Sequence, residues 1–269
     1  MNETEFRELV WQKGRTLYRD MPWREDPSSY RVWVSELMLQ QTQVSRVIPK
    51  FEAFMKRFPT IRELSESSLA DVLIAWSGLG YNRRAKFLWE AAIEVSLKYD
   101  GELPPEYARL VSLPGIGPNT AGAILNYAYE VPTAFVETNI RTVYFHHFFG
   151  DRTDITDKEL RQVVEQTMDQ EHPREFFWAL MDYGAHLKAT AGGRLSQSMH
   201  YKKQSPLAGS LREMRGKIIR ELTGSSLETE VLKRAVVADE RFARALKSLE
   251  AEGMLEYSDK RWRLPDNER

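Results

Sequence analysis

The sequence of 269 residues contains no cysteine. Without a thiolate, the chain can form neither a disulfide nor a cysteine-ligated zinc or iron–sulfur site. The histidines show no metal-ligand spacing either, because His146 and His147 are adjacent and would point apart on a helix. We therefore expect no metal and no cofactor.

Long hydrophobic runs are also missing. No apolar stretch approaches the roughly 20 residues that a membrane-spanning helix needs. The first residues, Met1 to Glu5, lack the basic start and the apolar core of a signal peptide. These absences predict a cytoplasmic protein without a membrane partner.

The chain has no excess of basic residues, since its formal net charge is −1. A nucleic-acid partner needs a basic face rather than a basic average, so this balance is only a weak argument against one. The charge is uneven: between Lys188 and Lys217 seven Lys or Arg residues accompany the single acid Glu213. This segment is either a solvated linker or a DNA-facing stretch.

Apolar residues recur at helical spacing through most of the chain, and prolines separate the runs. No convincing strand alternation occurs before residue 250, so the main body is predicted to be all-α. We expect an all-α domain over residues 1–188. Glycine, serine and proline then interrupt the periodicity over residues 189–210, which are predicted to be a linker or an extended crossing segment.

Residues 211–269 are predicted to form a small module of their own. Helices are expected over residues 212–222, 227–234 and 239–252, followed by strands 254–258 and 261–264 around an Asp259-Lys260 turn. Three helices and a terminal hairpin indicate a winged helix. Whether this module contacts DNA, binds a protein or only packs stays open.

Residues 113–125 read Leu-Pro-Gly-Ile-Gly-Pro-Asn-Thr-Ala-Gly-Ala-Ile-Leu, between a helix expected at 105–112 and one that begins at Pro118. Gly115 and Gly117 permit a tight hairpin whose amides point outward, and Pro118 suits a first helical position. Free amides at a helix N-terminus form a phosphate site that contacts the nucleic-acid backbone without reading sequence. This is the helix-hairpin-helix signature.

A family resemblance rests on this hairpin and on four further segments. They are Pro22-Trp23-Arg24, Tyr30 to Val44 (YRVWVSELMLQQTQV), Gly78-Leu79-Gly80-Tyr81 with Arg83-Arg84-Ala85, and Val136-Glu137-Thr138-Asn139-Ile140-Arg141. In this order they resemble the MutY-type adenine DNA glycosylases of the helix-hairpin-helix (endonuclease III-like) superfamily. The similarity runs from about Phe6 to Leu187.

The resemblance implies the all-α helix-hairpin-helix glycosylase fold and a role in base excision repair. Such an enzyme binds double-stranded DNA that contains a mismatched or damaged pair, flips the base out and hydrolyses its bond to the sugar. We expect a monomer that associates with the nucleoid if the source is bacterial or archaeal. The cysteines that usually hold an iron–sulfur cluster in this family are absent here.

Glu36 is the candidate general acid. It lies on a predicted helix among Val34, Leu37 and Met38, and an apolar setting raises the pKa of a carboxyl. The resemblance gives it the role of protonating the departing base. It also implies a second carboxyl facing the sugar cation, where the family has Asp and this chain has Glu137, with Asn139 beside it.

Asn119 occupies the position at which strand-cutting members of the superfamily carry a Schiff-base Lys. Asn forms no imine, so a monofunctional glycosylase without lyase activity is expected. Adenine opposite 8-oxoguanine or guanine is the expected target. Thymine, uracil or hypoxanthine in a mismatch is the alternative, and a catalytically weak DNA-lesion-binding protein is a rival from another class.

The resemblance also assigns the residues around the flipped base and along the duplex. The base pocket is expected to contain Trp23, Arg24, Leu39, Val44, Asn119 and Asp182. The expected DNA contacts are Gln40, Gln41, Tyr81, Leu113, Gly115, Gly117, Asn119, Thr120 and Arg141. In place of a cluster loop, phosphate contacts are expected from Lys188, Arg194, Lys202 and Lys203. The family's C-terminal reader of 8-oxoguanine is missing.

Overall fold

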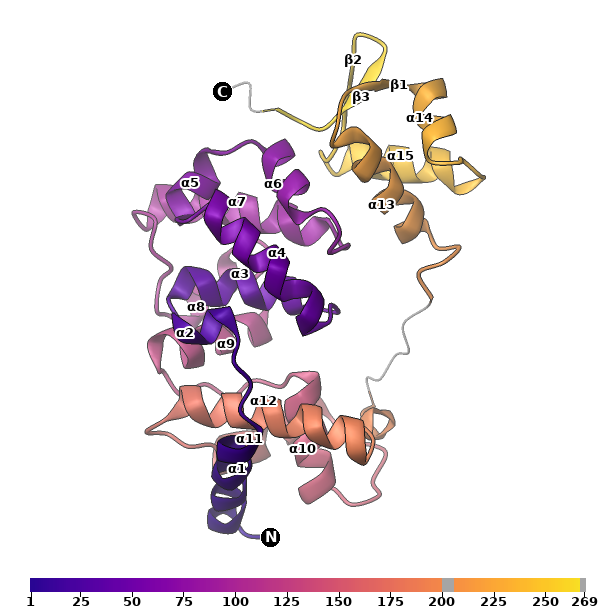
Figure 1. Cartoon of the computed structure of the whole chain (residues 1–269). Helices are drawn as coiled ribbons and strands as arrows, with labels where there is room; N and C mark the ends of the chain where they lie inside the picture. Colours follow the sequence, from indigo (N-terminus) through magenta and orange to yellow (C-terminus); the bar gives the residue numbers. More distant parts are fainter. Residues whose placement is uncertain (200–205, 267–269) are drawn as a thin grey trace. The chain divides into compact units, whose positions relative to one another are not determined.

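The computed structural model describes residues 1–199 and 206–266, which divide between two compact units (Figure 1). Unit 1 consists of Met1–Glu36 and Leu103–Lys203, and unit 2 consists of Leu37–Glu102 and Gln204–Arg269. The predicted all-α body is confirmed, because every described element before residue 227 is helical. Over the described ranges, no helix is both long and apolar enough to span a membrane.

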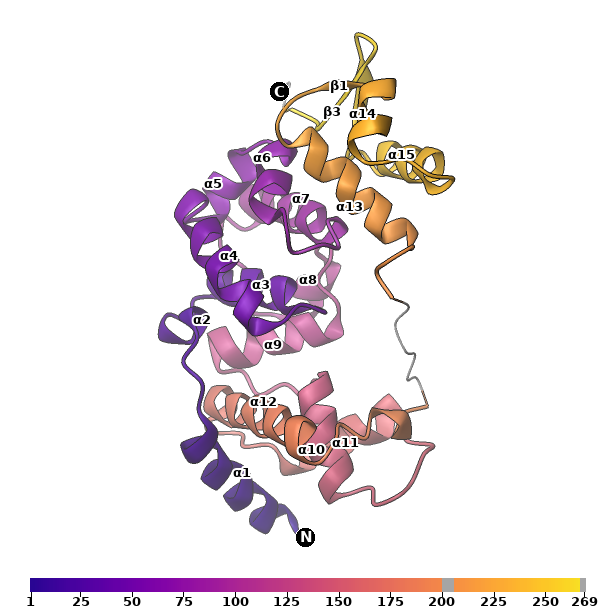
Figure 2. The ribbon, with the colours of Figure 1, turned by 45° about the vertical axis from the view of Figure 1, so that its right-hand side comes forward.

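Unit 1 is built around one long helix. Its elements are α1 (Glu3–Leu17), α2 (Pro22–Glu25), the first part of α3 (Ser29–Leu39), α8 (Tyr107–Ser112), α9 (Pro118–Tyr129), α10 (Thr138–His147), α11 (Asp157–Thr167), α12 (Pro173–Thr190) and the 3-10 turn η1 (Leu195–Gln197). Helix α12 packs against α1, α10 and α9 (Figure 2). The contacts include the stacked rings of Phe135 and Phe177, whose centroids are 4.7 Å apart.

Helices begin where local chemistry satisfies their first amides. Asn2 accepts a hydrogen bond from the Glu5 amide and receives the Glu5 side chain in return, which is a capping box at the start of α1. Pro118 and Pro173 occupy the first helical positions of α9 and α12, where a missing N–H costs nothing. The predicted start at Pro118 is confirmed.

Unit 2 contains four helices of the main body and the C-terminal module. The body helices are α4 (Val44–Arg57), α5 (Ile61–Glu66), α6 (Leu69–Trp76) and α7 (Arg83–Lys98). Their shared core is aromatic: the Phe54 ring lies 4.9 Å from Phe58 and 6.1 Å from Trp76, both in edge contacts. All three side chains are buried.

The C-terminal module has the expected three helices and terminal hairpin. Its elements are α13 (Leu211–Leu222), β1 (Leu227–Glu228), α14 (Thr229–Ala235), α15 (Arg241–Ala251), β2 (Glu256–Ser258) and β3 (Arg261–Arg263). The antiparallel sheet has the order β1-β3-β2. Asp259 and Lys260 both have positive φ, as a two-residue hairpin turn requires.

The predicted start of the second module helix at residue 227 is wrong. Leu227 and Glu228 are extended and pair with Trp262 and Arg261 of β3, so the helix begins only at Thr229. The pairing supplies hydrogen bonds from a segment 33 or more residues away, which outweighs the local preference for helix.

Residues 189–199 of the predicted linker belong to unit 1, and residues 206–210 belong to unit 2. Ser198 forms a parallel bridge with Ile155, and the Gln197 amide donates to the Gly150 carbonyl over 2.6 Å. These contacts favour a crossing segment over a free linker up to residue 199. Lys202 and Lys203 lie outside the described residues, and the boundaries at 188 and 210 stay predictions.

Candidate active site

Glu36 lies on α3 and belongs to unit 1. The residue is partly exposed, yet enough protein surrounds its carboxyl to shield it from bulk water. This burial and the nearby Glu137 carboxyl both raise the pKa of Glu36, Arg24 lowers it, and the net pKa is about 8. The side chain therefore holds its proton at neutral pH, as the sequence predicted.

Glu137 is the residue that precedes α10, and it is the second carboxyl of the pair. Its carboxylate does not cap its own helix. It lies near enough to Glu36 to raise the pKa of that carboxyl. Burial raises the pKa of Glu137 as well. Two carboxyls that share one shielded region cannot both ionise easily, so one proton is retained between them.

Asn119, on α9, positions the backbone in front of Glu137. Its Nδ2 donates to the Val136 carbonyl over 2.9 Å, and its Oδ1 accepts from the Val136 amide over 3.3 Å. The amide group is thus fixed in orientation by one residue of the chain. The sequence had placed Asn119 in the base pocket and on the DNA, and these two roles stay predictions.

Gly184 and Asn139 mark the close approach of α12 and α10. A Cβ on Gly184 would lie 2.1 Å from the Asn139 carbonyl oxygen, so only glycine permits this helix spacing. The approach sets the position of the α10 N-terminus, which carries Glu137 and Asn139. Gly184 was not among the predicted site residues, because a glycine inside a helical run gives no signal of what it packs against.

Arg24 and Asp182 form a buried ion pair beside the carboxyls. Arg24 donates to both carboxylate oxygens, over 2.8 and 3.1 Å, and the two side chains are 3% and 1% exposed. Arg19, which sequence analysis missed, adds a 2.6 Å hydrogen bond to the same carboxylate. Asp182 therefore acts as the anchor that holds Arg24, rather than as a free acceptor for a base.

Aromatic rings enclose this ion pair. The Arg24 guanidinium lies 5.2 Å from the ring centres of Tyr18 and Trp178. Tyr127 stacks on Trp178 with centroids 6.1 Å apart. Burial, together with the nearby acids led by Glu36, raises the pKa of Tyr127 well above its usual range. Tyr127 and Trp178 were missed because their helical spacing reads as core.

The helix-hairpin-helix turn has the predicted form. Leu113 is buried at the end of α8, Gly115 takes a positive φ of 73°, and Gly117 precedes α9. Gly115 and Gly117 are exposed, and nothing lies within 4 Å of a Cβ position on Gly117. An open backbone at a helix N-terminus is what a phosphate needs. Thr120, by contrast, is buried.

The other predicted contacts in unit 1 differ in exposure. Arg141 is ion-paired with Asp157 over 2.7 Å and donates to Ser198, so it joins α10 to α11 and to the segment after η1. Lys188 and Arg194 are exposed, as phosphate contacts require. Trp23 is buried at 5% exposure, and its role in the base pocket stays a prediction.

In unit 2, Arg84 holds the backbone next to Gln41 and Tyr81, two of the expected DNA contacts. Arg84 donates to the Gln40 carbonyl over 2.7 Å and to the Gly80 carbonyl over 3.1 Å, which joins the end of α3 to the Gly78–Tyr81 loop. Gln41 and Tyr81 both have positive φ, 57° and 49°. Leu39, Gln40 and Val44 are partly exposed on the same unit.

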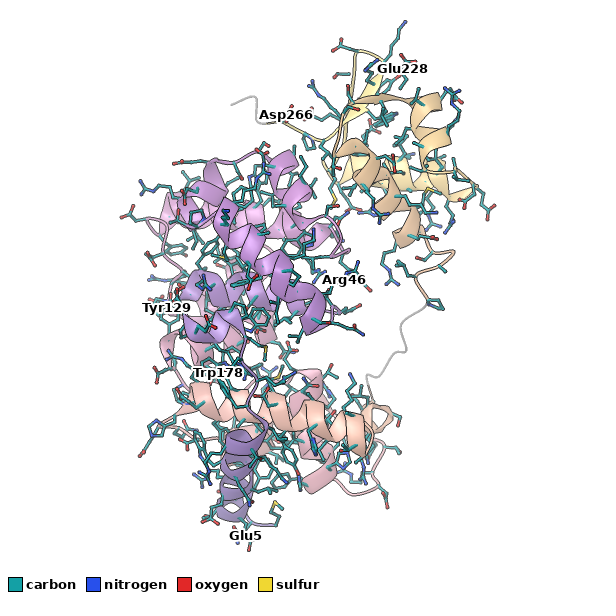
Figure 3. All side chains as sticks on the ribbon, viewed as in Figure 1. Glu5, Arg46, Tyr129, Trp178, Glu228 and Asp266 are labelled. Carbon is teal, nitrogen blue, oxygen red and sulfur yellow. The ribbon has the colours of Figure 1, made fainter. Side chains whose placement is uncertain are left out.

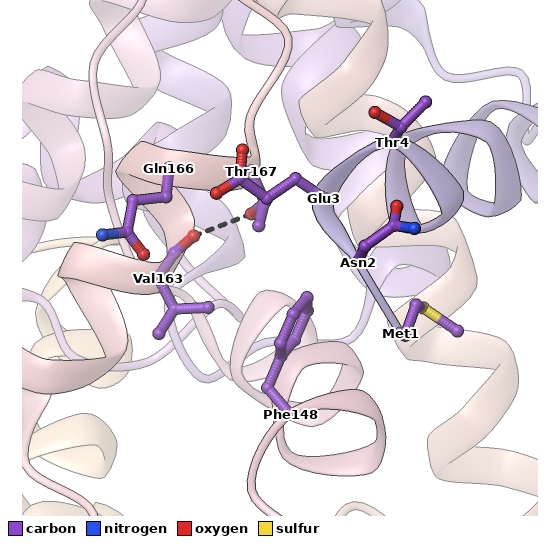
Figure 4. Close-up of a pocket in the computed structure, with 8 residues that line it drawn as sticks. All are labelled: Met1, Asn2, Glu3, Thr4, Phe148, Val163, Gln166 and Thr167. Atoms are coloured by element: carbon purple, nitrogen blue, oxygen red, sulfur yellow. Dashed lines mark hydrogen bonds between the residues drawn. The ribbon is translucent and has the colours of Figure 1, made fainter.

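A separate recess of about 620 Å³ occurs in unit 1 (Figure 4). Its lining comes from the start of α1, the end of α10 and α11: Met1, Asn2, Glu3, Thr4, Phe148, Val163, Gln166 and Thr167. None of the predicted site residues lines it. Over residues 1–199 and 206–266, no group of three or more acids and histidines is placed to hold a metal ion.

Comparison with known proteins places the chain in one family. Residues 34–169 match the family of HhH-GPD superfamily base excision DNA repair proteins. The adenine DNA glycosylase of Mycolicibacterium smegmatis is 33% identical over 261 residues, with 89% of each chain covered. That of Buchnera aphidicola subsp. Baizongia pistaciae is 39% identical over 168 residues, with 62% of this chain and 48% of the relative covered.

Solved structures agree on the fold. A thermostable thymine-DNA glycosylase superposes with a TM-score of 0.66 at 24% identity, covering 72% of this chain and 90% of that chain. The chain spans about half the length of several of its curated relatives. The chain belongs to the HhH-GPD superfamily of base excision DNA repair proteins and, within it, to the family of adenine DNA glycosylases.

Proposed function

We propose that the protein is a monofunctional DNA glycosylase that excises adenine mispaired with 8-oxoguanine or guanine. The observation that carries the proposal is the carboxyl pair: Glu36 keeps its proton to about pH 8 beside a second shielded carboxyl, Glu137. A proton donor next to an anion is the combination that cleavage of a glycosidic bond needs.

The reaction follows from the two roles. Glu36 donates its proton to a ring nitrogen of the flipped adenine, and the bond from C1′ to the base breaks with its electrons moving to the base. The sugar becomes oxocarbenium-like, and the Glu137 carboxylate faces this positive charge. Water then adds to C1′ and loses a proton to the carboxylate pair. The products are free adenine and an intact strand with an abasic site.

The geometry favours a purine over a pyrimidine. A purine leaves through protonation of a ring nitrogen, which the neutral Glu36 supplies, whereas a pyrimidine leaves as an anion on its carbonyl oxygens. Asn119 was expected to be able to read such a carbonyl, and its hydrogen bonds to the Val136 N–H and C=O fix the orientation of its amide group. No described contact supports a thymine, uracil or hypoxanthine glycosylase over an adenine glycosylase.

The partner is double-stranded DNA that contains the mismatch, bound by a monomer. The open hairpin at Gly115 and Gly117 and the exposed Lys188 and Arg194 suit phosphates, which position the enzyme without reading sequence. Tyr81 and Gln41 suit the space that the flipped base leaves in the stack. We propose that the enzyme works without iron or another cofactor, because the chain has no cysteine to hold a cluster.

A single-turnover panel tests the substrate. Duplexes with A:8-oxoG, A:G, T:G, U:G and hypoxanthine are incubated with excess enzyme, and abasic sites are converted to strand breaks with alkali. We expect adenine to be released fastest, in both contexts, and no break without alkali. Faster release of a pyrimidine would mean that the protein is a thymine or uracil mismatch glycosylase. Binding without any release would mean that it is a lesion-binding protein.

A further inference from the structure

Tyr81 of the Gly78–Tyr81 loop is held between two guanidinium groups within unit 2. Arg212, on α13 of the C-terminal module, donates to the Tyr81 hydroxyl over 2.5 Å, and its guanidinium lies 4.9 Å from the ring centre. Arg84 lies 5.3 Å from the same ring centre. The hydrogen bond to its hydroxyl and the two nearby cations hold the Tyr81 ring in position.

The C-terminal module is fixed on the body by contacts away from this tyrosine. The Ala70 amide donates to the Pro265 carbonyl over 3.1 Å, and Arg83 lies 3.7 Å from Glu252. The contact of Arg212 with Tyr81 is thus one of several that join the C-terminal module to the body helices of unit 2. Sequence analysis had left the role of the module open.

Basic side chains surround the same loop. Arg46, labelled in Figure 3, is exposed and donates to the Gly78 carbonyl. The Lys50 ammonium lies 3.6 Å from the position that a Cβ on Gly78 would take. The acids on the facing helices are engaged elsewhere, because Glu213 pairs with Arg241 and Glu252 pairs with Arg215. Three cations, Arg46, Lys50 and Arg212, thus lie around the loop.

We propose that the surface around this loop is a duplex-binding site that continues from the body onto the C-terminal module, with Arg212 contacting a backbone phosphate next to the point where Tyr81 inserts. The guanidinium suits this task, because it is a partly exposed cation at the Tyr81 hydroxyl, and arginine binds phosphate through charge-assisted hydrogen bonds. Tyr81 and Arg212 act as one unit: the ring fills the stack, and the cation holds the strand beside it. The inference rests on the proposed function in taking duplex DNA as the partner.

The test compares DNA binding by two variants of one helix. Arg212→Ala removes the cation at the loop, and Arg220→Ala removes an exposed cation from the last turn of α13. Affinity for a mismatched and a fully paired duplex is measured at several salt concentrations. We expect Arg212→Ala to weaken binding on the order of tenfold and to reduce the log–log salt slope by roughly 0.9, the value for one lost phosphate contact. Arg220→Ala should leave both nearly unchanged.

Two further variants test the link to Tyr81. Arg212→Lys keeps the charge but loses the planar guanidinium, so its salt slope should stay near wild type while the hold on Tyr81 is impaired. The fluorescence of a 2-aminopurine next to the mismatch reports base unstacking, and we expect Tyr81→Ala and Arg212→Lys each to reduce the signal. The losses should not add in the double variant, since both remove the same unit.

The outcomes separate this inference from the proposed activity. If Arg212→Ala binds like Arg220→Ala, the module does not contact the duplex and the inference is wrong. If Arg212→Ala binds more tightly, Arg212 restrains Tyr81 in the free protein, which also overturns it. A wild type that excises no base, but whose binding depends on Arg212 as expected, would overturn the proposed activity and leave the duplex-binding surface standing.

Discussion

At the scale of single residues, the protonation of Glu36 controls the chemistry. Removal from bulk water and the field of Glu137 outweigh the attraction of Arg24, and the pKa rises from its ordinary value of 4.5 to about 8. The ion pair between Arg24 and Asp182 explains why Arg24 lowers the pKa of Glu36 only a little. The Arg24 charge is already neutralised by a carboxylate 2.8 Å away, so little of it acts on Glu36.

The first prediction concerns the pH profile of excision. Only protonated Glu36 donates to the base, so the single-turnover rate should be steady at neutral pH and fall about tenfold per unit above roughly pH 8. The rate on an adenine mismatch is measured between pH 6 and pH 9.5, with DNA binding followed in parallel to correct for lost affinity. A rate that rises through pH 8 would show that the acid is not Glu36.

The second prediction concerns stability. Between pH 4.5 and about pH 8 the folded Glu36 binds a proton that the unfolded side chain releases, so the free energy of unfolding falls as pH rises through this window. The slope from this one group is at most about 1.4 kcal/mol per pH unit. Glu36→Gln removes this pH dependence. In urea titrations, the free energy of unfolding of the variant should therefore rise relative to that of the wild type from pH 5 to pH 8. Parallel curves would mean that Glu36 titrates normally.

The third prediction concerns Asn119. Because an amide forms no imine with the sugar, borohydride should trap no covalent complex between the enzyme and nicked or abasic DNA. The assay is a denaturing gel of reactions with a labelled adenine-mismatch duplex. A strand-cutting relative serves as the positive control. A trapped band at the stoichiometry of the enzyme would show that a lysine elsewhere in the chain attacks the sugar.

At the scale of elements, the packing of α12 against α10 places the second carboxyl. Glu137 stands just before α10, and the backbone of α10 at Asn139 touches α12 at Gly184. Any side chain at residue 184 must push the helices apart and shift Glu137. The hydrogen bonds from Asn119 fix the same segment from the α9 side.

The fourth prediction tests this contact. Gly184→Ala should destabilise the protein by about 1–3 kcal/mol and lower the excision rate more than it lowers DNA affinity, because it displaces Glu137 and not the hairpin. Gly216→Ala is the matched control on α13, where a Cβ meets nothing within 4 Å, and it should be neutral or slightly stabilising. If both variants unfold and react like wild type, the helix spacing does not set the site.

Elements could be predicted from the sequence where their causes are local. The start of α9 at Pro118 and the hairpin around Gly115 depend on residues within one turn, and both are confirmed. Leu227 was wrongly expected in a helix, because its strand conformation depends on Trp262. The hydrogen bond from Arg212 to Tyr81 joins residues 131 positions apart, and no local pattern indicates it.

At the scale of the whole molecule, the resemblance identified the family, and it named Glu137 and Arg24, which both act on the pKa of Glu36. It did not indicate their partners. Arg24 and Asp182 were both expected in the pocket, but their ion pair, 158 residues apart in sequence, appears only in the fold. Tyr127 was missed because a buried aromatic residue at helical spacing is usually core, and only its neighbours distinguish it.

The central claim is that Glu36 donates the proton that releases adenine. The most direct test is single-turnover excision from an A:8-oxoG duplex by the wild type and by Glu36→Gln, with binding of the same duplex measured for both. We predict that the variant loses at least about a thousandfold in rate, as expected for the loss of a general acid in a shielded site, while its affinity stays within a few-fold. Equal rates for the two proteins would contradict the account.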